Sequence, residues 1–239
     1  YRMSIELPKL KKVSKNKVKK PKILLLSDDL RLHSGIATQS KEIVLSTVHK
    51  YDWVQLGAAL KHPEHGKTFI LDDDVKKTTG VEDASVKIYA HTSYGNPEIL
   101  RQLINIEKPD AILHFTDPRF WIWLFQMEHE LRQEIPILYY NIWDDLPYPR
   151  WNEPFYESCD LIMNISKQTV NIVEQVAQKK PRTDWDCTYI PHGIPEDKLY
   201  ITVHESDEES EKIWLEEIGV NKERISKLGD EDNFWSMGD

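Results

Sequence analysis

Short apolar runs alternate with longer amphipathic stretches along most of this chain. The first run is apolar at four successive positions, Ile23 to Leu26, which predicts a strand that is covered on both faces. Ser34 follows as the predicted N-cap of a helix that opens with Gly35 and Ile36. Such a helix start offers free N–H groups to a phosphate or a hydroxyl group, although an ordinary capped turn explains the same residues.

The remaining pattern predicts an α/β protein. Further strands are expected at 52–56, 69–71, 86–89, 111–115, 136–141, 161–165 and 188–190, and helices at 97–107, 120–131, 151–158 and 167–178. Strands that alternate with helices indicate a Rossmann-like, doubly wound parallel sheet of about six or seven strands. The first strand is expected in a central position, because its apolar run needs cover on both sides.

Polar residues follow several of these strands directly. Parallel strands place their carboxyl ends on one edge of the sheet, where ligands bind near the switch in strand order. The residues expected at this edge are Ser34, Gly35, Asp117, Asp144, Ser166 and His192.

The composition changes along the chain and predicts three parts. Residues 1–21 form a basic leader, with eight lysines and no acid between Lys9 and Lys22. This leader is either a solvated flexible arm or an arm that contacts the phosphates of a nucleic acid or a membrane surface. Residues 22–200 form the predicted Rossmann-like domain. Residues 201–239 are predicted to be an acidic helical tail or the start of a linker to a further domain.

The charge and the cysteine content argue against some classes of protein. The net charge of −9 argues against a protein that is basic throughout and built to coat nucleic acid. Cys159 and Cys187 lack metal-ligand spacing and are expected as free thiols, which favours a cytoplasmic location. No apolar run approaches the roughly 20 residues that span a bilayer, and no signal peptide is evident.

Four segments resemble the amino-terminal half of a GT-B glycosyltransferase, most closely the large family 4 of retaining enzymes. They are the opening ILLLSDDLRLHSGIATQS, the strand ILHFTDP, the segment YYNIWDDLPYP, and DLIMNISKQTV followed by YIPHGIPEDKL. The resemblance covers about residues 22–200. It implies transfer of a sugar from a nucleotide-sugar donor, with this half holding the acceptor. The carboxyl-terminal domain that binds the donor in that family is not evident here, so the chain is expected to be an enzyme only when a donor domain is present.

The same resemblance assigns roles to single residues. It implies Asp117 and Asp144 as catalytic groups that orient acceptor hydroxyls or act as a base, although each can equally cap a loop or a helix. The implied substrate-binding residues are Ser34, Gly35, Ile36, Thr116, Trp143, His192 and Gly193, with Trp143 stacking on a sugar ring and His192-Gly193 also serving as an interdomain hinge. No cofactor and no metal are implied, because fixed cations and helix ends stabilise the departing diphosphate.

Two other functions fit the sequence. One is a non-catalytic GT-B-like domain that binds a partner through its aromatic loops. The other is a phage-type transferase that modifies DNA and holds the duplex with the Lys9–Lys22 arm.

Overall fold

The computed structural model describes residues 19–177 and 186–193 of the chain. The chain divides into two units, Tyr1–Pro191 and His192–Asp239, and the fold described below belongs to the first. The basic leader up to residue 18 and the segment 194–239 lie outside the described residues, so the predictions made for them stay predictions.

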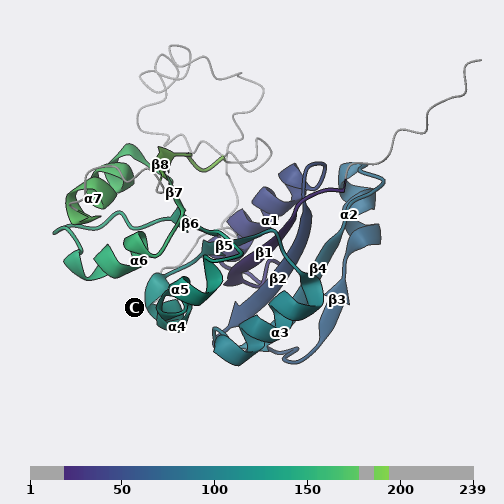
Figure 1. Ribbon diagram of the computed structural model, residues 1–239. Coiled ribbons are helices and arrows are strands. Elements are labelled where there is room, and N and C mark those ends of the chain that lie inside the picture. The colour runs from purple at the N-terminus through teal and green to yellow at the C-terminus, as the bar shows by residue number, and fades with distance from the viewer. Residues whose placement is uncertain (1–18, 178–185, 194–239) are drawn as a thin grey trace, which may run out of the picture. The chain divides into compact units, whose positions relative to one another are not determined.

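Eight strands form one sheet in the first unit (Figure 1). They are β1 (Lys22–Asp28), β2 (Asp52–Ala59), β3 (Thr68–Ile70), β4 (Val86–Thr92), β5 (Ala111–Phe115), β6 (Ile137–Asn141), β7 (Leu161–Asn164) and β8 (Asp186–Tyr189). The order across the sheet is β3-β4-β2-β1-β5-β6-β7-β8, and all neighbours are parallel except β3, which runs antiparallel to β4. The predicted α/β fold and the central place of the first strand are confirmed, and the sheet has more strands than the six or seven expected.

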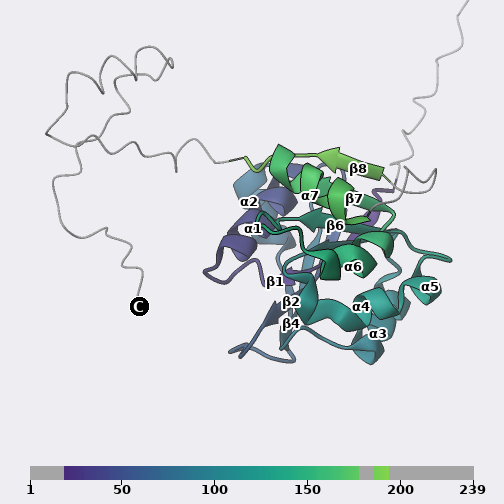
Figure 2. The ribbon, with the colours of Figure 1, turned by 90° about the vertical axis from the view of Figure 1, so that its left-hand side faces the viewer.

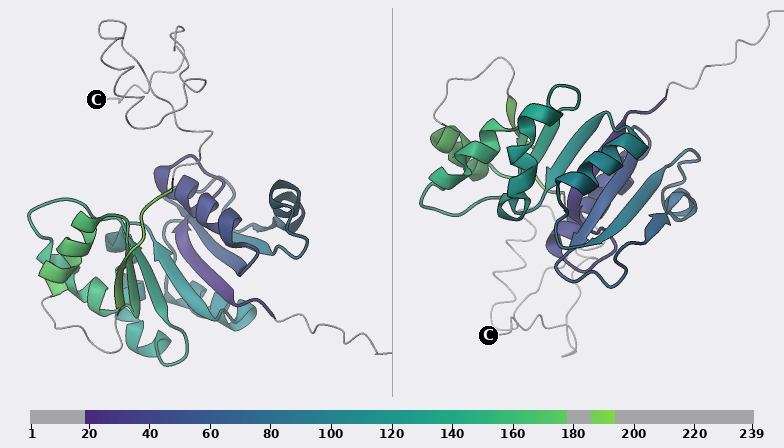
Figure 3. Two further views of the ribbon diagram at one scale, coloured as in Figure 1. Left: turned by 90° about the horizontal axis from the view of Figure 1, so that it is seen from above. Right: turned by 60° about the horizontal axis from the view of Figure 1, so that its bottom comes forward.

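Helices and 3₁₀ turns connect the strands. They are α1 (Gly35–Thr47), α2 (Asp72–Thr79), α3 (Pro97–Glu107), η1 (Pro118–Trp121), α4 (Ile122–Gln126), α5 (Glu128–Leu131), η2 (Arg150–Asn152), α6 (Glu153–Glu157) and α7 (Lys167–Ala177). In Figure 2, α1 and α2 lie on one side of strands β1, β2 and β4, while α3 and α4 lie on the other. Figure 3 shows the same layers from two further directions.

β1 separates two apolar cores. Leu24 and Leu26 point into the core beneath α3, α4 and α6, whereas Ile23 and Leu25 point into the core beneath α1 and α2. The three leucines of the strand are completely inaccessible to solvent, as expected for a strand that is covered on both faces.

Local sequence signals set several helix starts. Ser34 caps α1 by accepting a hydrogen bond from the Ala37 N–H (3.0 Å), and Asn96 caps α3 in the same way, with Pro97 at the first helical position. One predicted helix was wrong, because the single helix expected at 120–131 is divided into η1, α4 and α5. The sequence analysis expected no helix at α2, which opens with three aspartates at 72–74, where acids favour the positive helix end.

Cations and one buried acid join the amino ends of the strands. Glu107, at the end of α3, accepts hydrogen bonds from Lys22 Nζ (3.0 Å), Lys87 Nζ (2.7 Å) and the Tyr89 hydroxyl (2.6 Å). Burial alone would raise the pKa of Glu107, but these bonds outweigh it and lower the pKa to about 2. Lys20 is also engaged, donating to the Val48 and Asp83 carbonyls, so two of the eight lysines of the predicted arm are structural.

Both cysteines are free thiols, as predicted, with Cys159 buried and Cys187 partly exposed. Among the residues that the structure describes, no helix is long and apolar enough to cross a membrane.

We predict that Glu107→Gln lowers the stability of the sheet unit by about 1–3 kcal/mol, because it removes a charge from a buried, hydrogen-bonded network. In the wild type, the contribution of Glu107 is fully present above its unfolded pKa of 4.5 and is lost as the pH falls toward its folded pKa of about 2. Urea unfolding across this pH range measures both effects, and the variant should lose less stability on acidification. Glu130→Gln is the matched control, because Glu130 forms an exposed pair with Arg101 and should cost little.

Candidate functional site

The switch in strand order lies between β1 and β5. From β1 the chain moves outward through β2 and β4, and then returns to the other side of β1 with β5. The loops that follow β1 and β5 therefore meet at the carboxyl edge of the sheet, where ligands bind in folds of this type. Ser34 and Asp117 lie on these two loops, so the structure brings this pair of predicted residues to the same edge.

A carboxylate already faces the start of α1. The Ser34 hydroxyl donates a hydrogen bond to Asp28 Oδ2 (2.9 Å) while it accepts from the first turn of the helix. Burial raises the pKa of Asp28, and the bond from Ser34 offsets part of this rise. Negative charge at this position disfavours a phosphate, so of the two ligands that the sequence suggested for this helix start, a hydroxyl group fits better than a phosphate.

The other predicted residues of this helix start differ in their surroundings. A Cβ atom built on Gly35 meets no atom within 4 Å, so the position borders open space and does not require glycine for close packing. Ile36 is partly buried and packs against the core beneath α1. Its side chain therefore has a packing role in this structure.

Asp117 caps the turn η1 and holds an arginine. Its carboxylate accepts from the Arg119 backbone N–H (2.9 Å) and from the Arg119 guanidinium (3.0 Å). Burial would raise the pKa of Asp117, but the bonds from Arg119 prevail and lower it. The preceding Thr116 is buried at 4% exposure, which leaves little of it for a ligand to contact.

The charges of Asp28 and Asp117, the two acids at the carboxyl edge of the sheet, both act on Tyr94. Burial raises the pKa of its hydroxyl, and the charges of Asp28 and Asp117 raise it further. The charges of the two carboxylates thus act on the same tyrosine, while their own pKa values are shifted in opposite directions, upward for Asp28 and downward for Asp117. Pairs of acids with divergent pKa values are the arrangement that general acid–base chemistry uses.

The loop after β6 carries two further predicted residues, Trp143 and Asp144, in different surroundings. Trp143 is partly buried against the core beneath α4 and α6, with the Arg119 guanidinium 5.2 Å from the centre of its ring. Asp144 is exposed, and its backbone carbonyl accepts a hydrogen bond from Gln168. Asp145, rather than Asp144, binds the backbone N–H of Leu146.

Ser166 caps helix α7. Its hydroxyl accepts a hydrogen bond from the Thr169 N–H (3.0 Å) at the start of α7. His192 and Gly193 belong to the second unit, so their place in the predicted site stays a prediction.

The structure adds a buried polar cluster that the sequence analysis missed. Asp29, which is fully buried, pairs with Arg31 (2.7 Å) and with Nε2 of the buried His62 (3.0 Å). Because His62 Nδ1 accepts from the Glu64 N–H, its Nε2 carries the proton and donates to Asp29. In the sequence alone, only the position of Asp29 near the end of the first strand pointed to this cluster. His62 lies 33 residues further along the chain, so no local pattern connects the two residues.

His114 is a second residue that becomes informative only in the fold. It is fully buried among Trp121, Phe125 and Tyr139, with ring centres 5.1–5.5 Å away. Burial lowers the pKa of its imidazole to about 3, and the nearby charge of Asp117 only partly opposes this. His114 is therefore neutral at pH 7 and packs as an aromatic residue.

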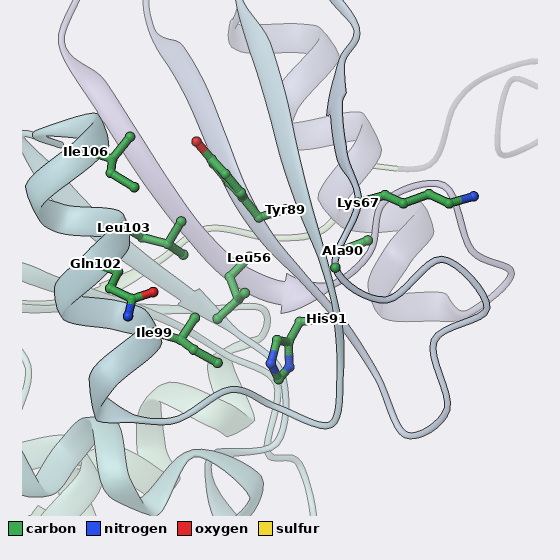
Figure 4. A pocket seen from close by; sticks show the side chains of 10 residues that line it. Leu56, Lys67, Tyr89, Ala90, His91, Ile99, Gln102, Leu103 and Ile106 are labelled. Carbon is green, nitrogen blue, oxygen red and sulfur yellow. The ribbon is translucent and has the colours of Figure 1, made fainter.

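A pocket of about 180 Å³ lies between α3 and β4, away from the predicted residues (Figure 4). Ile99, Leu103 and Ile106 of the helix face Tyr89 and His91 of the strand. Its walls are mainly apolar, and none of the predicted site residues lines it. Within residues 19–177 and 186–193, no three His, Cys, Asp or Glu side chains gather in a way that could hold a metal ion.

Comparison with known protein families finds a match at the carboxyl end of the chain. The family described as tRNA synthetases class II (A) matches residues 183–239. The alanine–tRNA ligase of Hydrogenovibrio crunogenus is 64% identical over 47 residues, which are 20% of this chain and 5% of the relative. The alanine–tRNA ligase of Psychromonas ingrahamii is 51% identical over 55 residues, which are 23% of this chain and 6% of the relative. The chain thus spans about a twentieth of the length of these curated relatives.

Among solved structures, the chain is similar to Anabaena Alr3699/HepE, whose crystal structure contains UDP and glucose. The similarity has a TM-score of 0.44 and 14% sequence identity, and it covers 82% of this chain and 50% of the other.

The curated relatives correct the predicted function. They are alanine–tRNA ligases, so the prediction of a glycosyltransferase that uses a nucleotide sugar is wrong, together with the alternatives framed on the same resemblance. The segment YIPHGIPEDKL, which belonged to the most specific part of that resemblance, lies within the matched range 183–239. A short polar segment with Pro-x-Gly spacing is compatible with more than one family, which is why it misled the sequence analysis.

We predict that Gly57→Ala destabilises the sheet unit by about 1–3 kcal/mol, because it overpacks a rigid site. The new methyl carbon would lie 2.8 Å from Asp29 Oδ2, and Asp29 is held in place by Arg31 and His62. Urea unfolding measures the loss. Gly35→Ala is the matched control, since its methyl group meets open space in a helix and should leave stability unchanged or slightly higher.

We also predict that Arg119→Ala raises the pKa of Asp117, because the burial of this carboxylate then acts without its main opposing partner. Carboxyl chemical shifts, followed by NMR over a pH titration, report the change. Arg101→Ala removes an exposed arginine from a pair on other elements and should leave Asp117 unchanged. A pKa of Asp117 that stays where it is in the wild type would contradict the assigned pairing.

Proposed function

We propose that this chain takes part in the attachment of alanine to tRNA, and that residues 183–239 contribute to recognition of the tRNA. The observation that carries this proposal is the identity of 64% over 47 residues to an alanine–tRNA ligase. The match to class II synthetases over the same end of the chain supports it independently of any single relative. Because the segment is a small part of those enzymes, binding of the tRNA is the step to test first.

The amino-terminal lysines are also compatible with the binding of a nucleic acid. Lys20 and Lys22 are held within the sheet unit, which leaves six of the eight lysines between positions 9 and 22 as candidates for phosphate contacts. Such contacts are independent of base sequence and weaken with salt. They would add affinity to a tRNA complex without adding preference for alanine tRNA.

The proposal includes a cytoplasmic location. What supports it is the pair of free thiols, Cys159 and Cys187, since disulfides are rare in reducing compartments. Asp117, which the sequence predicted, and Asp28, which the structure adds at the same edge of the sheet, are candidates for contacts with a hydroxyl or amino group of a substrate.

The test is the affinity of the full chain for alanine tRNA and for a tRNA of another specificity, measured by filter binding at several salt concentrations. We expect tighter binding of alanine tRNA. The double variant Lys222→Ala with Arg224→Ala removes two positive charges from the matched segment, so it should weaken binding. The slope of log affinity against log salt should fall by the amount expected for the loss of about one to two phosphate contacts.

Lys76→Ala is the matched control, because Lys76 pairs with Glu82 near the end of α2 and lies outside the matched segment. It should bind tRNA as the wild type does. Equal affinity for both tRNAs, or unchanged binding by the double variant, would overturn the proposed role of residues 183–239.

A further inference from the structure

Exposed apolar side chains gather on two loops at the carboxyl edge of the sheet. Phe120 and Ile122 follow β5 and are 50% and 47% exposed, while Trp151 lies in η2 after β6 and is 57% exposed. Leu146 and Tyr148 on the same second loop are also exposed. The two loops lead into α4 and α6, which lie beside each other (Figure 2). Large apolar groups in one exposed region commonly mark a binding surface.

Two sets of ring contacts, linked by the chain neighbours Arg119 and Phe120, form what we call the aromatic band, which comprises Tyr94, Arg119, Phe120, Trp143 and Trp151. Phe120 stacks on Tyr94 with ring centres 4.7 Å apart and planes inclined by 14°. Arg119, the neighbour of Phe120, places its guanidinium over Trp143, and Trp143 meets Trp151 edge to face at 6.0 Å. Trp151 is 57% exposed, so about half of its side chain stays accessible to a ligand.

The charges around the aromatic band nearly cancel. Arg119 is 58% exposed but is paired with Asp117, and the exposed Arg150 is offset by the exposed Asp144 and Asp145. The band thus has no strong positive field that would attract a phosphate backbone by charge alone. A partner would gain its affinity here from flat, stackable groups.

We propose that the aromatic band binds unpaired bases of a single-stranded RNA segment by stacking. The inference rests on the proposed function for its choice of partner, because that function makes RNA the expected ligand. Every base has a flat π face, and stacking on aromatic side chains tolerates any sequence. A regular duplex does not fit this surface, since its bases are already stacked on one another.

Trp151 is the residue on which the proposal depends most. It is the most exposed aromatic side chain of the band, and it belongs to neither buried core, so its removal leaves both cores intact. Arg119 contributes a second flat group, which can stack on a base by its guanidinium plane.

The experiment measures binding of a short, unstructured, fluorescently labelled RNA to the full chain by anisotropy, between about 50 and 200 mM salt. We expect Trp151→Ala to weaken binding roughly 5- to 100-fold, the effect of losing one stacked base, while Trp151→Phe keeps most of the affinity. Because the aromatic band carries little net charge, the slope of affinity against salt should be the same for both variants and the wild type. Ile70→Ala is the control, since Ile70 is an even more exposed apolar residue (69%) on β3, the edge strand on the other side of β1 from β5 and β6.

Unchanged RNA binding by Trp151→Ala, or a duplex bound as tightly as the single strand, would overturn the proposal. Binding of an oligosaccharide that depends on Trp151, without binding of RNA, would also overturn it and would assign the aromatic band to carbohydrate. The two proposals fail separately, because the Lys222 and Arg224 variant tests preference for alanine tRNA while Trp151→Ala tests stacking.

Discussion

The burial of β1 on both faces is the constraint from which the rest of this unit follows. Leu24, Leu25 and Leu26 are inaccessible to solvent, and alternate side chains of the strand enter the two cores. A strand with no solvent-facing side needs a partner strand at each edge and a helical layer above and below. β2 and β5 are the strands that pair with the two edges of β1, and α1 and α3 belong to the two helical layers. The position of β1 also fixes the switch in strand order, and with it the edge of the sheet at which both Asp28 and Asp117 lie.

The two ends of the sheet use charge in different ways. At the amino ends, Glu107 is buried and held by Lys22, Lys87 and Tyr89, so its charge is fully matched and the arrangement stabilises the fold. At the carboxyl ends, Asp28 has a hydroxyl partner in Ser34 and a raised pKa. An incompletely matched carboxylate is costly to keep for stability alone, and such groups concentrate at sites that bind or transform ligands.

The two parts of the chain carry different kinds of information. Its first unit has a doubly wound topology that many unrelated functions use, so the sheet alone does not identify an activity. Its carboxyl-terminal segment has high sequence identity to alanine–tRNA ligases over a short range. The RNA-binding role that we propose for the aromatic band would give the first unit the same class of partner as the one proposed for the carboxyl-terminal segment. The band lies at the edge where the switch in strand order places ligands.

The sequence by itself determined the strands and many helix starts. Uninterrupted apolar runs at 23–26 and 111–115 were sufficient for β1 and β5, and Ser34, Asn96 and Ser166 were recognisable as caps because a cap and its target N–H are two or three residues apart. The tertiary structure decided which polar residues share partners. His62 reaches Asp29 across 33 positions, and Glu107 joins Lys22 across 85, distances at which no local pattern reports a contact. It also decided that Asp117 holds Arg119 while Asp144 faces solvent, because the path of each loop, rather than the strand before it, sets where its side chains point.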